Sequence, residues 1–408
     1  MWTRGVKHGL RGATLAFALW VAALGAAAEP VVLEFSGWGA PSVEAIFERF
    51  NAEHDGIQIM LVPGGAAQIL ARMAAGTGPD LYRVSWAEFA PWMQQGLAVD
   101  LTPFIERDQE ELQLEDIWPR ALEPFQLNGR QYAMPHHIGG NLMYINIDRV
   151  DEAGLPLPRS DWDWDEFVAY AARLSLDRNN DGAMDVWGFV NPQMWAFSIA
   201  MIASEGVRFF DPNLPAFNVD TPAMHRAMQR IYDLVHIHRG APGPGERPNA
   251  AEAWSSGSAA MTMQSANPSW SQVDFRFTVL PNPSGPAGRV MPGGPQPLAI
   301  SPYSEHVEEA WTFIKWIVRP DIQAWISGEL GLFPPARRSA IPFVDNPVLR
   351  IFGGELENQL VYTTVAHSTY ERAFIQQMDA VLAHRQSIPA AAREIQLQMD
   401  NALAEAWK

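Results

Sequence analysis

The stretch AAGTGPDLYRVSWAEFAPWMQQGLAVDLTPFI, residues 74–105, decides the fold class. Within it, DLYRVS at residues 80–85 predicts a strand. The segment from Trp86 to Gln95 predicts a helix, and Gly96 marks its end because a glycine commonly follows the last helical turn. A strand that leads directly into a helix is the building unit of α/β folds.

The chain before this unit repeats the same alternation. VVLEF (31–35) and IQIMLV (57–62) predict strands, and a second helix is expected after Gly64-Gly65. Between the two strands, four apolar residues have the spacing of one helix face: Val43, Ile46, Phe47 and Phe50. This alternation predicts an α/β layer with largely parallel strands.

The second half of the chain is more helical. Thr221-Pro222 predicts a helix start, and apolar spacing predicts further helices at 307–317 and from about Pro389. Pro- and Gly-rich runs at 240–248 and 281–297 are expected to be loops or crossings between lobes.

The first 28 residues have the pattern of a secretory signal peptide. Basic residues precede the apolar run ATLAFALWVAALGAAA (13–28), whose end fits a cleavage site after Ala28. The alternative is an uncleaved membrane anchor, which the short run disfavours. No other segment is long and apolar enough to span a bilayer, so we expect a protein that is not inserted in the membrane after cleavage.

Composition excludes several classes of function. Without residues 1–28 the 29 basic residues fall to 26 against 46 acidic ones, a net charge of −20 that repels nucleic acid and anionic membranes. The chain has no cysteine, which excludes disulfides, thiol catalysis, cysteine-bound zinc and a lipid anchor at the cleavage site. We therefore expect a periplasmic protein without a lipid anchor.

Eight segments spread over nearly the whole of the chain after residue 28 carry a family pattern. In order, they are AIFERFNAEHDGIQI, residues 74–105 quoted above, GRQYAMPHHIGGNLMYINIDRVDEAGLPLP, DWDWDEFVAYAARLSLD, SGSAAMTMQSANPSW, MPGGPQPLAIS, EEAWTFIKWI and GLFPPARRS. In this order they resemble family 1 of the bacterial extracellular solute-binding proteins, the carbohydrate-binding, maltose-binding-protein-like components of ABC importers. The family often has Gly-Pro-Trp where this chain has Asn267-Pro268-Ser269-Trp270, which leaves the ligand open.

The resemblance implies an α/β protein with the two-lobed, type II periplasmic-binding-protein fold and a ligand cleft between the lobes. The lobes would consist of residues 29–137 plus 299–335 and residues 138–298 plus 336–408. The hinge crossings would lie near residues 135–140, 294–298 and 334–337. A general rule supports this expectation, because α/β sheets bind ligands at the carboxyl ends of their strands.

Aromatic side chains that stack on sugar rings are the expected chemistry of a carbohydrate site. Four tryptophans at the ends of predicted elements are candidates for this role: Trp38, Trp86, Trp195 and Trp270. Core packing is the alternative for each of them. Core packing is also the expectation for three tryptophans within helical periodicity: Trp311, Trp316 and Trp325.

Six further residues are candidate ligand contacts: Gly65, His137, Asn141, Asn267, Gly294 and Arg337. The amides at the helix start after Gly65 could bind a hydroxyl group or an anion, and a tight turn is the alternative. Hinge or backbone-bonding roles are the alternatives for His137, Asn141 and Gly294, and solvent exposure is the alternative for Arg337. A metal site at His136-His137 is not expected, because adjacent residues of a strand point to opposite faces.

The loop SLDRNNDGAMDVWGF (175–189) has part of the pattern of a calcium-binding EF-hand loop. The ligands would be Asp177, Asn179, Asp181, the Ala183 carbonyl and Asp185. The loop lacks the glutamate that completes such a site, because Gly188 stands in its place, and a calcium sensor is therefore excluded. A structural calcium ion and a metal-free turn rich in Asp and Asn both stay open.

The sequence thus predicts a binding protein that delivers a carbohydrate, a mono- or oligosaccharide or a polyol, to ABC permease subunits in the inner membrane. It is expected to be a monomer that catalyses no reaction and requires no cofactor. One alternative is a secreted glycoside hydrolase or lyase, for which the acidic run at 161–166 would have to supply two facing carboxylates. The other is a binding protein for an anionic ligand, such as a sugar phosphate or a uronate.

Overall fold

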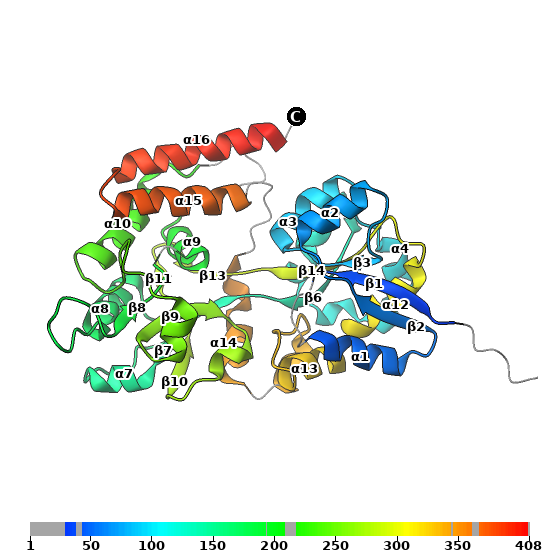
Figure 1. The fold of residues 1–408 in the computed structure, drawn as a ribbon, viewed down its shortest axis with the longest axis horizontal. Coiled ribbons are helices and arrows are strands. Elements are labelled where there is room, and N and C mark those ends of the chain that lie inside the picture. Colours follow the sequence, from blue (N-terminus) through cyan, green and yellow to red (C-terminus); the bar gives the residue numbers. More distant parts are fainter. Residues whose placement is uncertain are drawn as a thin grey trace, which may run out of the picture.

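The computed structural model describes residues 29–37, 43–192, 194–208, 218–343, 346–360 and 367–406. The described chain forms two lobes, each built on its own β-sheet (Figure 1). Two strands of the first sheet, β6 (Met134–Ile138) and β14 (Pro295–Ile300), adjoin the segments that connect the lobes. No helix within these ranges is long and apolar enough to cross a bilayer.

The first lobe is built on a five-stranded sheet with the strand order β2-β1-β3-β14-β6. Its strands are β1 (Val31–Ser36), β2 (Ile57–Leu61), β3 (Leu81–Tyr82), β6 (Met134–Ile138) and β14 (Pro295–Ile300). Its helices are α1 (Glu44–Glu53), α2 (Ala66–Ala74), α3 (Trp86–Gln94), α4 (Thr102–Arg107), α5 (Gln109–Leu112), α6 (Pro119–Leu122), α12 (Val307–Ile317) and α13 (Pro320–Gly328). Short elements complete it: 3-10 turns η2 (Leu114–Asp116) and η3 (Glu123–Phe125), and the hairpin of β4 (Gln126–Leu127) and β5 (Arg130–Gln131).

The second lobe is built on a four-stranded sheet with the strand order β10-β7-β9-β8. Its strands are β7 (Asn141–Asn146), β8 (Trp187–Phe189), β9 (Ala259–Ser265) and β10 (Phe277–Leu280). Its helices are α7 (Ile147–Glu152), α8 (Trp164–Leu174), α9 (Trp195–Ser204), α10 (Pro222–His236), α11 (Ala250–Ser255), α14 (Pro347–Glu355), α15 (His367–Leu382) and α16 (Ile388–Ala406). α15 and α16 pack together and against α10, at the upper edge of this lobe (Figure 1).

Short elements follow the second sheet or join the lobes. They are the hairpin of β11 (Ser284–Gly285) and β12 (Gly288–Arg289), the parallel pair of β13 (Met291–Pro292) and β15 (Gln359–Leu360), and the 3-10 turns η4 (Pro268–Ser271), η5 (Arg338–Phe343) and η6 (Leu356–Asn358). The predicted loop at 281–297 therefore contains three short strands and the start of β14.

The parallel pairing expected for the alternating strands of the first part of the chain is confirmed, but each complete sheet is mixed. β2, β1 and β3 pair in parallel, as the alternation of strands and helices predicts. β14 pairs antiparallel with both β3 and β6. In the second sheet, β7 pairs antiparallel with β9 and β10, and only β8 and β9 pair in parallel. The reason is that β14 enters the first sheet from the second lobe, so its direction is not set by a local strand-helix-strand unit.

The predicted amphipathic helices bury the expected faces. Ile46, Phe47 and Phe50 of α1 are buried, and the ring centroids of Phe47 and Phe35 lie 5.3 Å apart. Burying each such ring contributes roughly 1.5–3 kcal/mol to the free energy of folding. At the start of α10, the Thr221 hydroxyl accepts the amide of Met224, which confirms the predicted helix start.

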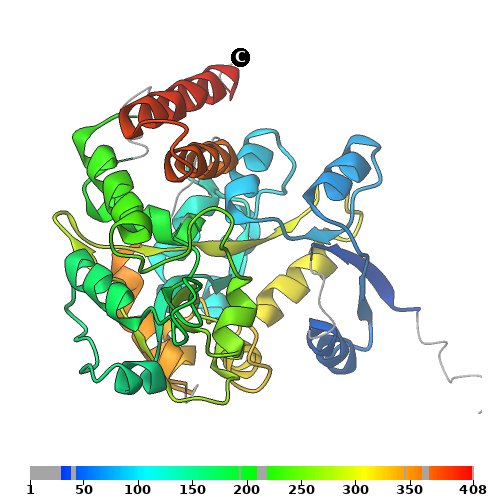
Figure 2. The ribbon, with the colours of Figure 1, turned by 60° about the vertical axis from the view of Figure 1, so that its left-hand side comes forward.

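Two pairs of glycines join the lobes at a point where their backbones touch. Gly139-Gly140 connects β6 to β7, and Gly293-Gly294 connects β13 to β14. The amide of Gly139 donates to the carbonyl oxygen of Gly294 at 2.8 Å. A Cβ atom on Gly293 would lie 2.3 Å from the Gly139 carbonyl oxygen, so only glycine permits this approach. In Figure 2, β14 continues from this point into the first sheet. The sequence-based lobe boundary at 298/299 therefore falls inside β14, not between the sheets.

We expect Gly293→Ala to lower the free energy of unfolding by about 2–3 kcal/mol, because the new methyl group forces the two crossings apart. Gly354→Ala is the matched control. Gly354 lies in α14, and a Cβ atom there meets nothing within 4 Å. That change should raise stability by about 0.5–1 kcal/mol. Urea unfolding of both variants measures the difference, and equal stabilities would contradict this account of the crossings.

Candidate functional site

Aromatic side chains from the two lobes meet beside the glycine crossings. Trp86, the first residue of α3, and Trp195, the first residue of α9, have ring centroids 6.5 Å apart. Trp86 is buried, whereas Trp195 is half-buried. A Cβ atom on Gly294 would lie 3.0 Å from the Trp86 ring, so the indole rests on the backbone of the crossing. The structure thus brings together three of the predicted ligand-binding residues, and we call this place the lobe junction.

Arg83 follows β3 and adds a cation to the lobe junction. Its Nη2 donates to Gln296 Oε1 at 3.0 Å, and its Nη1 lies 3.4 Å from the carbonyl oxygen of Gly37. Burial lowers the pKa of Arg83, with an opposing contribution from Glu88. The sequence analysis did not select Arg83 or Gln296, because it placed Arg83 inside the predicted strand 80–85, whereas the observed strand ends at Tyr82.

His136 and His137 are both buried in β6 and touch each other, with ring centroids 4.3 Å apart. The expectation that they point to opposite faces was therefore wrong. The reason is a β-bulge: Gln296 of β14 pairs with His137, and Pro297 pairs with Pro135, so His136 is the extra residue. The His137 ring stacks on Phe333 at 4.3 Å. Its Nδ1 is buried without a hydrogen-bond partner among the described residues.

Asn141 and two other amide side chains tie the crossings together. Asn141 Nδ2 donates to the carbonyl oxygen of Pro292 at 3.1 Å, and Asn282 Nδ2 donates to the carbonyl oxygen of Asn141 at 2.9 Å. Gln359 Nε2 donates to the carbonyl oxygen of Gly139 at 2.7 Å. The side chain of Asn141 thus satisfies backbone at the crossing, which was the alternative to ligand binding.

Trp270 and Asn267 lie at the end of β9, close to the same crossing. Ser265, the last residue of β9, pairs with Asn141 and accepts the indole N–H of Trp270 at 3.2 Å. Trp270 is half-buried against Trp254, whose indole N–H donates to the Trp270 carbonyl oxygen at 3.2 Å. Asn267 caps η4 by accepting the amide of Ser269. Trp270 packs on a different core cluster from Trp195, so the structure does not bring these two predicted residues together.

Arg337 is not a ligand contact, and the prediction that it binds solute was wrong. Its side chain is buried inside the first lobe, and Nη1 lies 3.1 Å from the carbonyl oxygen of Gln113 and 3.5 Å from Asp116. Nε and Nη2 donate to the carbonyl oxygens of Val318 and Leu112. All three guanidinium nitrogens of Arg337 therefore bond to the protein itself and stabilise the first lobe.

Gly65 and Trp38 are the two remaining predicted ligand contacts. The amide of Gly65 donates to Gln68 Oε1 at 2.6 Å in a capping interaction of α2, so this amide is already occupied. Trp38 lies outside the described residues. Gly37, the residue before it, packs its backbone directly against Arg83, since a Cβ there would lie 1.9 Å from the Arg83 carbonyl oxygen.

The oxygens of the 177–185 loop accept hydrogen bonds from its own backbone. Asp177 accepts the amides of Asp181 and Gly182, at 3.2 and 2.8 Å. Asn179 accepts the amide of Asp181, Asp181 accepts that of Ala183, and Asp185 accepts that of Arg178. Among the described residues, no group of three or more His, Asp or Glu side chains is arranged to hold a metal ion. The calcium site stays a prediction.

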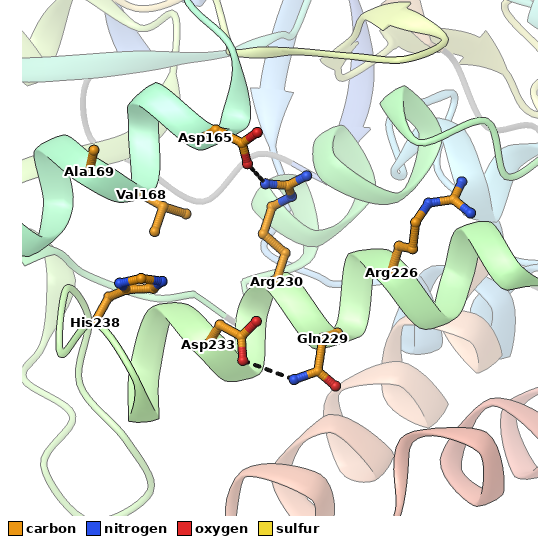
Figure 3. A pocket seen from close by; sticks show the side chains of 8 residues that line it. All are labelled: Asp165, Val168, Ala169, Arg226, Gln229, Arg230, Asp233 and His238. Atoms are coloured by element: carbon orange, nitrogen blue, oxygen red, sulfur yellow. Dashed lines mark hydrogen bonds and ion pairs between the residues drawn. The ribbon is translucent and has the colours of Figure 1, made fainter.

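The acidic run at 161–166 serves the fold. Asp163 caps α8 by accepting the amide of Glu166 at 2.9 Å, and the Glu166 carboxylate accepts the amide of Asp163. Asp165 forms an ion pair with Arg230 across a pocket of about 500 Å³ between α8 and α10 (Figure 3). Arg230 also pairs with the buried Glu205 at 3.3 Å, so charges in this pocket are already matched. None of the predicted ligand-binding residues lines it.

The two buried histidines should make stability depend on pH. Burial, with a contribution from the charge of Arg83, lowers the pKa of both His136 and His137 well below 6.5. The unfolded chain therefore takes up protons that the folded chain does not, and stability is lost as pH falls below about 6.5, by up to about 1.4 kcal/mol per pH unit for each histidine.

Thermal unfolding between pH 7.5 and 4.5 measures this loss. We expect His137→Phe to reduce the slope, because one of the two groups is gone and phenylalanine can keep the stack on Phe333. The exposed His238→Gln serves as the control and should keep the parent slope. Identical slopes for the parent and His137→Phe would contradict the prediction.

Solved structures with the same fold come from carbohydrate-bound proteins. An ABC substrate-binding protein from Listeria monocytogenes in complex with cycloalternan is 17% identical with a TM-score of 0.82, and the match covers 92% of this chain and 99% of that one. The maltose/maltodextrin-binding domain MalE from Bdellovibrio bacteriovorus, bound to maltotriose, is 18% identical with a TM-score of 0.77 over 91% of this chain and 99% of that one. These likenesses confirm the predicted two-lobed, type II periplasmic-binding-protein fold.

Sequence comparison gives the family. A putative binding protein of Brucella abortus is 24% identical over 330 residues, which cover 76% of each chain. An arabinooligosaccharide-binding protein of Halalkalibacterium halodurans is 28% identical over 186 residues, 45% of this chain and 39% of the relative. The family model of the bacterial extracellular solute-binding proteins matches residues 36–324, and the chain therefore belongs to that family.

Proposed function

We propose that this protein captures a carbohydrate between its two lobes and delivers it to the permease of an ABC importer. The observation that carries the proposal is the contact of Trp86 with Trp195 beside the glycine crossings. Each ring starts a helix of a different lobe, so a solute bound there touches both lobes at once. Tryptophan faces offer a large apolar area with little entropy to lose, which suits the C–H face of a sugar ring.

Relatives support the same class of ligand. An arabinooligosaccharide-binding protein is among the similar sequences, and carbohydrate-bound proteins are among the similar structures. The family is one of binding proteins, and the carboxylates Asp163, Asp165 and Glu166 are engaged in capping and ion pairing. We therefore propose capture without catalysis, by a monomer in the periplasm.

A screen of mono- and oligosaccharides by thermal shift tests the proposed function. A ligand at a hundred times its dissociation constant should add about 2.7 kcal/mol to the stability of the folded protein. Product analysis of the same mixtures tests for hydrolysis or elimination. A melting temperature that no sugar raises would contradict carbohydrate capture, and turnover would contradict capture without catalysis.

Two tryptophans of the second lobe, one at the lobe junction and one at the end of β9, should supply much of the affinity. We expect Trp195→Ala and Trp270→Ala each to weaken sugar binding by about 2 kcal/mol or more, as at interface hot spots. Trp316→Ala is the matched control, because Trp316 is buried in the first lobe with its indole N–H donated to Glu53 at 2.7 Å. It should cost about 3–5 kcal/mol of stability and leave the affinity of the folded fraction unchanged. Titration calorimetry on folded samples separates the two effects, and parent-like binding by both Trp195→Ala and Trp270→Ala would show that neither tryptophan belongs to the binding site.

The 177–185 loop is proposed as a structural calcium site. The support is the alternation of Asp177, Asn179 and Asp181 around Gly182, where calcium would replace backbone amides as the partner of these oxygens. A chelator should then lower the melting temperature, and added calcium should restore it. Asp181→Ala should lose this response and still bind sugar. Equal melting temperatures of metal-free and calcium-loaded protein would contradict the calcium site and favour the metal-free turn.

A further inference from the structure

We infer that the solute carries a carboxylate group and that Arg83 binds it. This inference rests on the proposed function and adds the charge of the ligand to it. It starts from an electrostatic imbalance at the lobe junction, where a partly buried guanidinium group faces polar but uncharged partners.

The hydrogen bonds of Arg83 leave much of its guanidinium group unused. An arginine has five N–H donors, and two nitrogens of Arg83 each have one partner, Gln296 and Gly37. Its Nε is buried and has no hydrogen-bond partner among the described residues. Both partners are neutral oxygens, so neither compensates the positive charge.

Arg83 also lacks a counter-ion within the described part of the chain. No carboxylate there lies within 4.0 Å of its nitrogens, whereas Arg247 and Arg289, which are also partly buried, pair with Asp379 and Glu355. Glu88 acts on Arg83 only at longer range, and its carboxylate accepts the amide and hydroxyl of Ser85 at 3.1 and 2.7 Å. A buried charge without a partner is costly, so the site is poised for an anion from outside.

Arg83 and the aromatic contact both lie at the start of β14. Gln296 is the second residue of this strand, and Gly294 stands two positions before it. Arg83 bonds to the first, and Trp86 rests on the second. His137 is directly opposite Gln296, and its Nδ1 is also buried without a hydrogen-bond partner among the described residues.

The charge count favours a carboxylate over a phosphate. Burial keeps His136 and His137 neutral, so Arg83 is the one cation that the described residues contribute to this cluster. A single guanidinium group matches the single charge of a carboxylate and can donate two parallel N–H bonds to it. A phosphate group carries close to two charges at neutral pH and would need a second cation.

Matched pairs of sugars test the inference by titration calorimetry. The probes are glucose and glucuronate, galactose and galacturonate, mannose and mannuronate, the oligomers of each, and glucose 6-phosphate. We expect at least one uronate to bind ten times or more tightly than its neutral counterpart. Equal or tighter binding of the neutral sugar overturns the inference and leaves the proposed function standing. If glucose 6-phosphate is the tightest ligand, the inference that the solute carries a carboxylate group is wrong. If no probe of either class binds, the proposed function fails together with the inference.

Variants of Arg83 then test the residue itself against the best uronate. Arg83→Gln should weaken uronate binding about 30-fold or more and change the binding of the neutral sugar by less than about threefold. Arg83→Lys keeps the charge without the planar fork and should fall between the two. Arg247→Gln, which removes a partly buried arginine of the second lobe, should bind like the parent. If folded Arg83→Gln loses affinity for the uronate and the neutral sugar to the same extent, or loses affinity for neither, Arg83 does not bind the carboxylate.

Discussion

The backbone contact between Gly139 and Gly293-Gly294 is the constraint on which the rest of the structure depends. It brings two chain segments that lie far apart in the sequence closer than any residue with a Cβ atom would permit. The hydrogen bonds of Asn141 and Gln359 hold the same segments in place. The two lobes are therefore joined at a point where their backbones are held at hydrogen-bond distance.

The same constraint explains why so different a set of side chains meets at the lobe junction. Trp86 rests on the backbone of Gly294 and also contacts Trp195 of the other lobe. Beside the bulge at His136, His137 pairs with Gln296, whose side chain accepts a hydrogen bond from Arg83. An aromatic platform with polar nitrogens at its edge is therefore a product of two chain crossings and one irregular strand pair, rather than of any single motif.

The sequence predicts the parts of this structure that depend on local chemistry. Strand and helix positions follow from periodicity and capping, and the place of Trp86 and Trp195 follows from their position at element ends. The parts that it does not predict depend on distant partners. The bulge at His136 is visible only in the pairing with β14, and Arg337 is buried because carbonyl oxygens from two other segments surround it. The mixed pairing of the first sheet has the same origin, since β14 arrives from the other lobe.

The late arrival of β14 has a consequence for how the chain folds. Residues 295–300 fill the place between β3 and β6, so the first sheet stays open until the intervening second lobe has been synthesised. Closing the loop from residue 139 to residue 294 costs roughly 4–5 kcal/mol of chain entropy before that strand pairs. Until then β3 has one open edge beside its partner β1, and β6 has no native neighbour in the sheet. Contacts between residues more than a hundred positions apart slow folding, so we expect the pairing of β14 to be a late step.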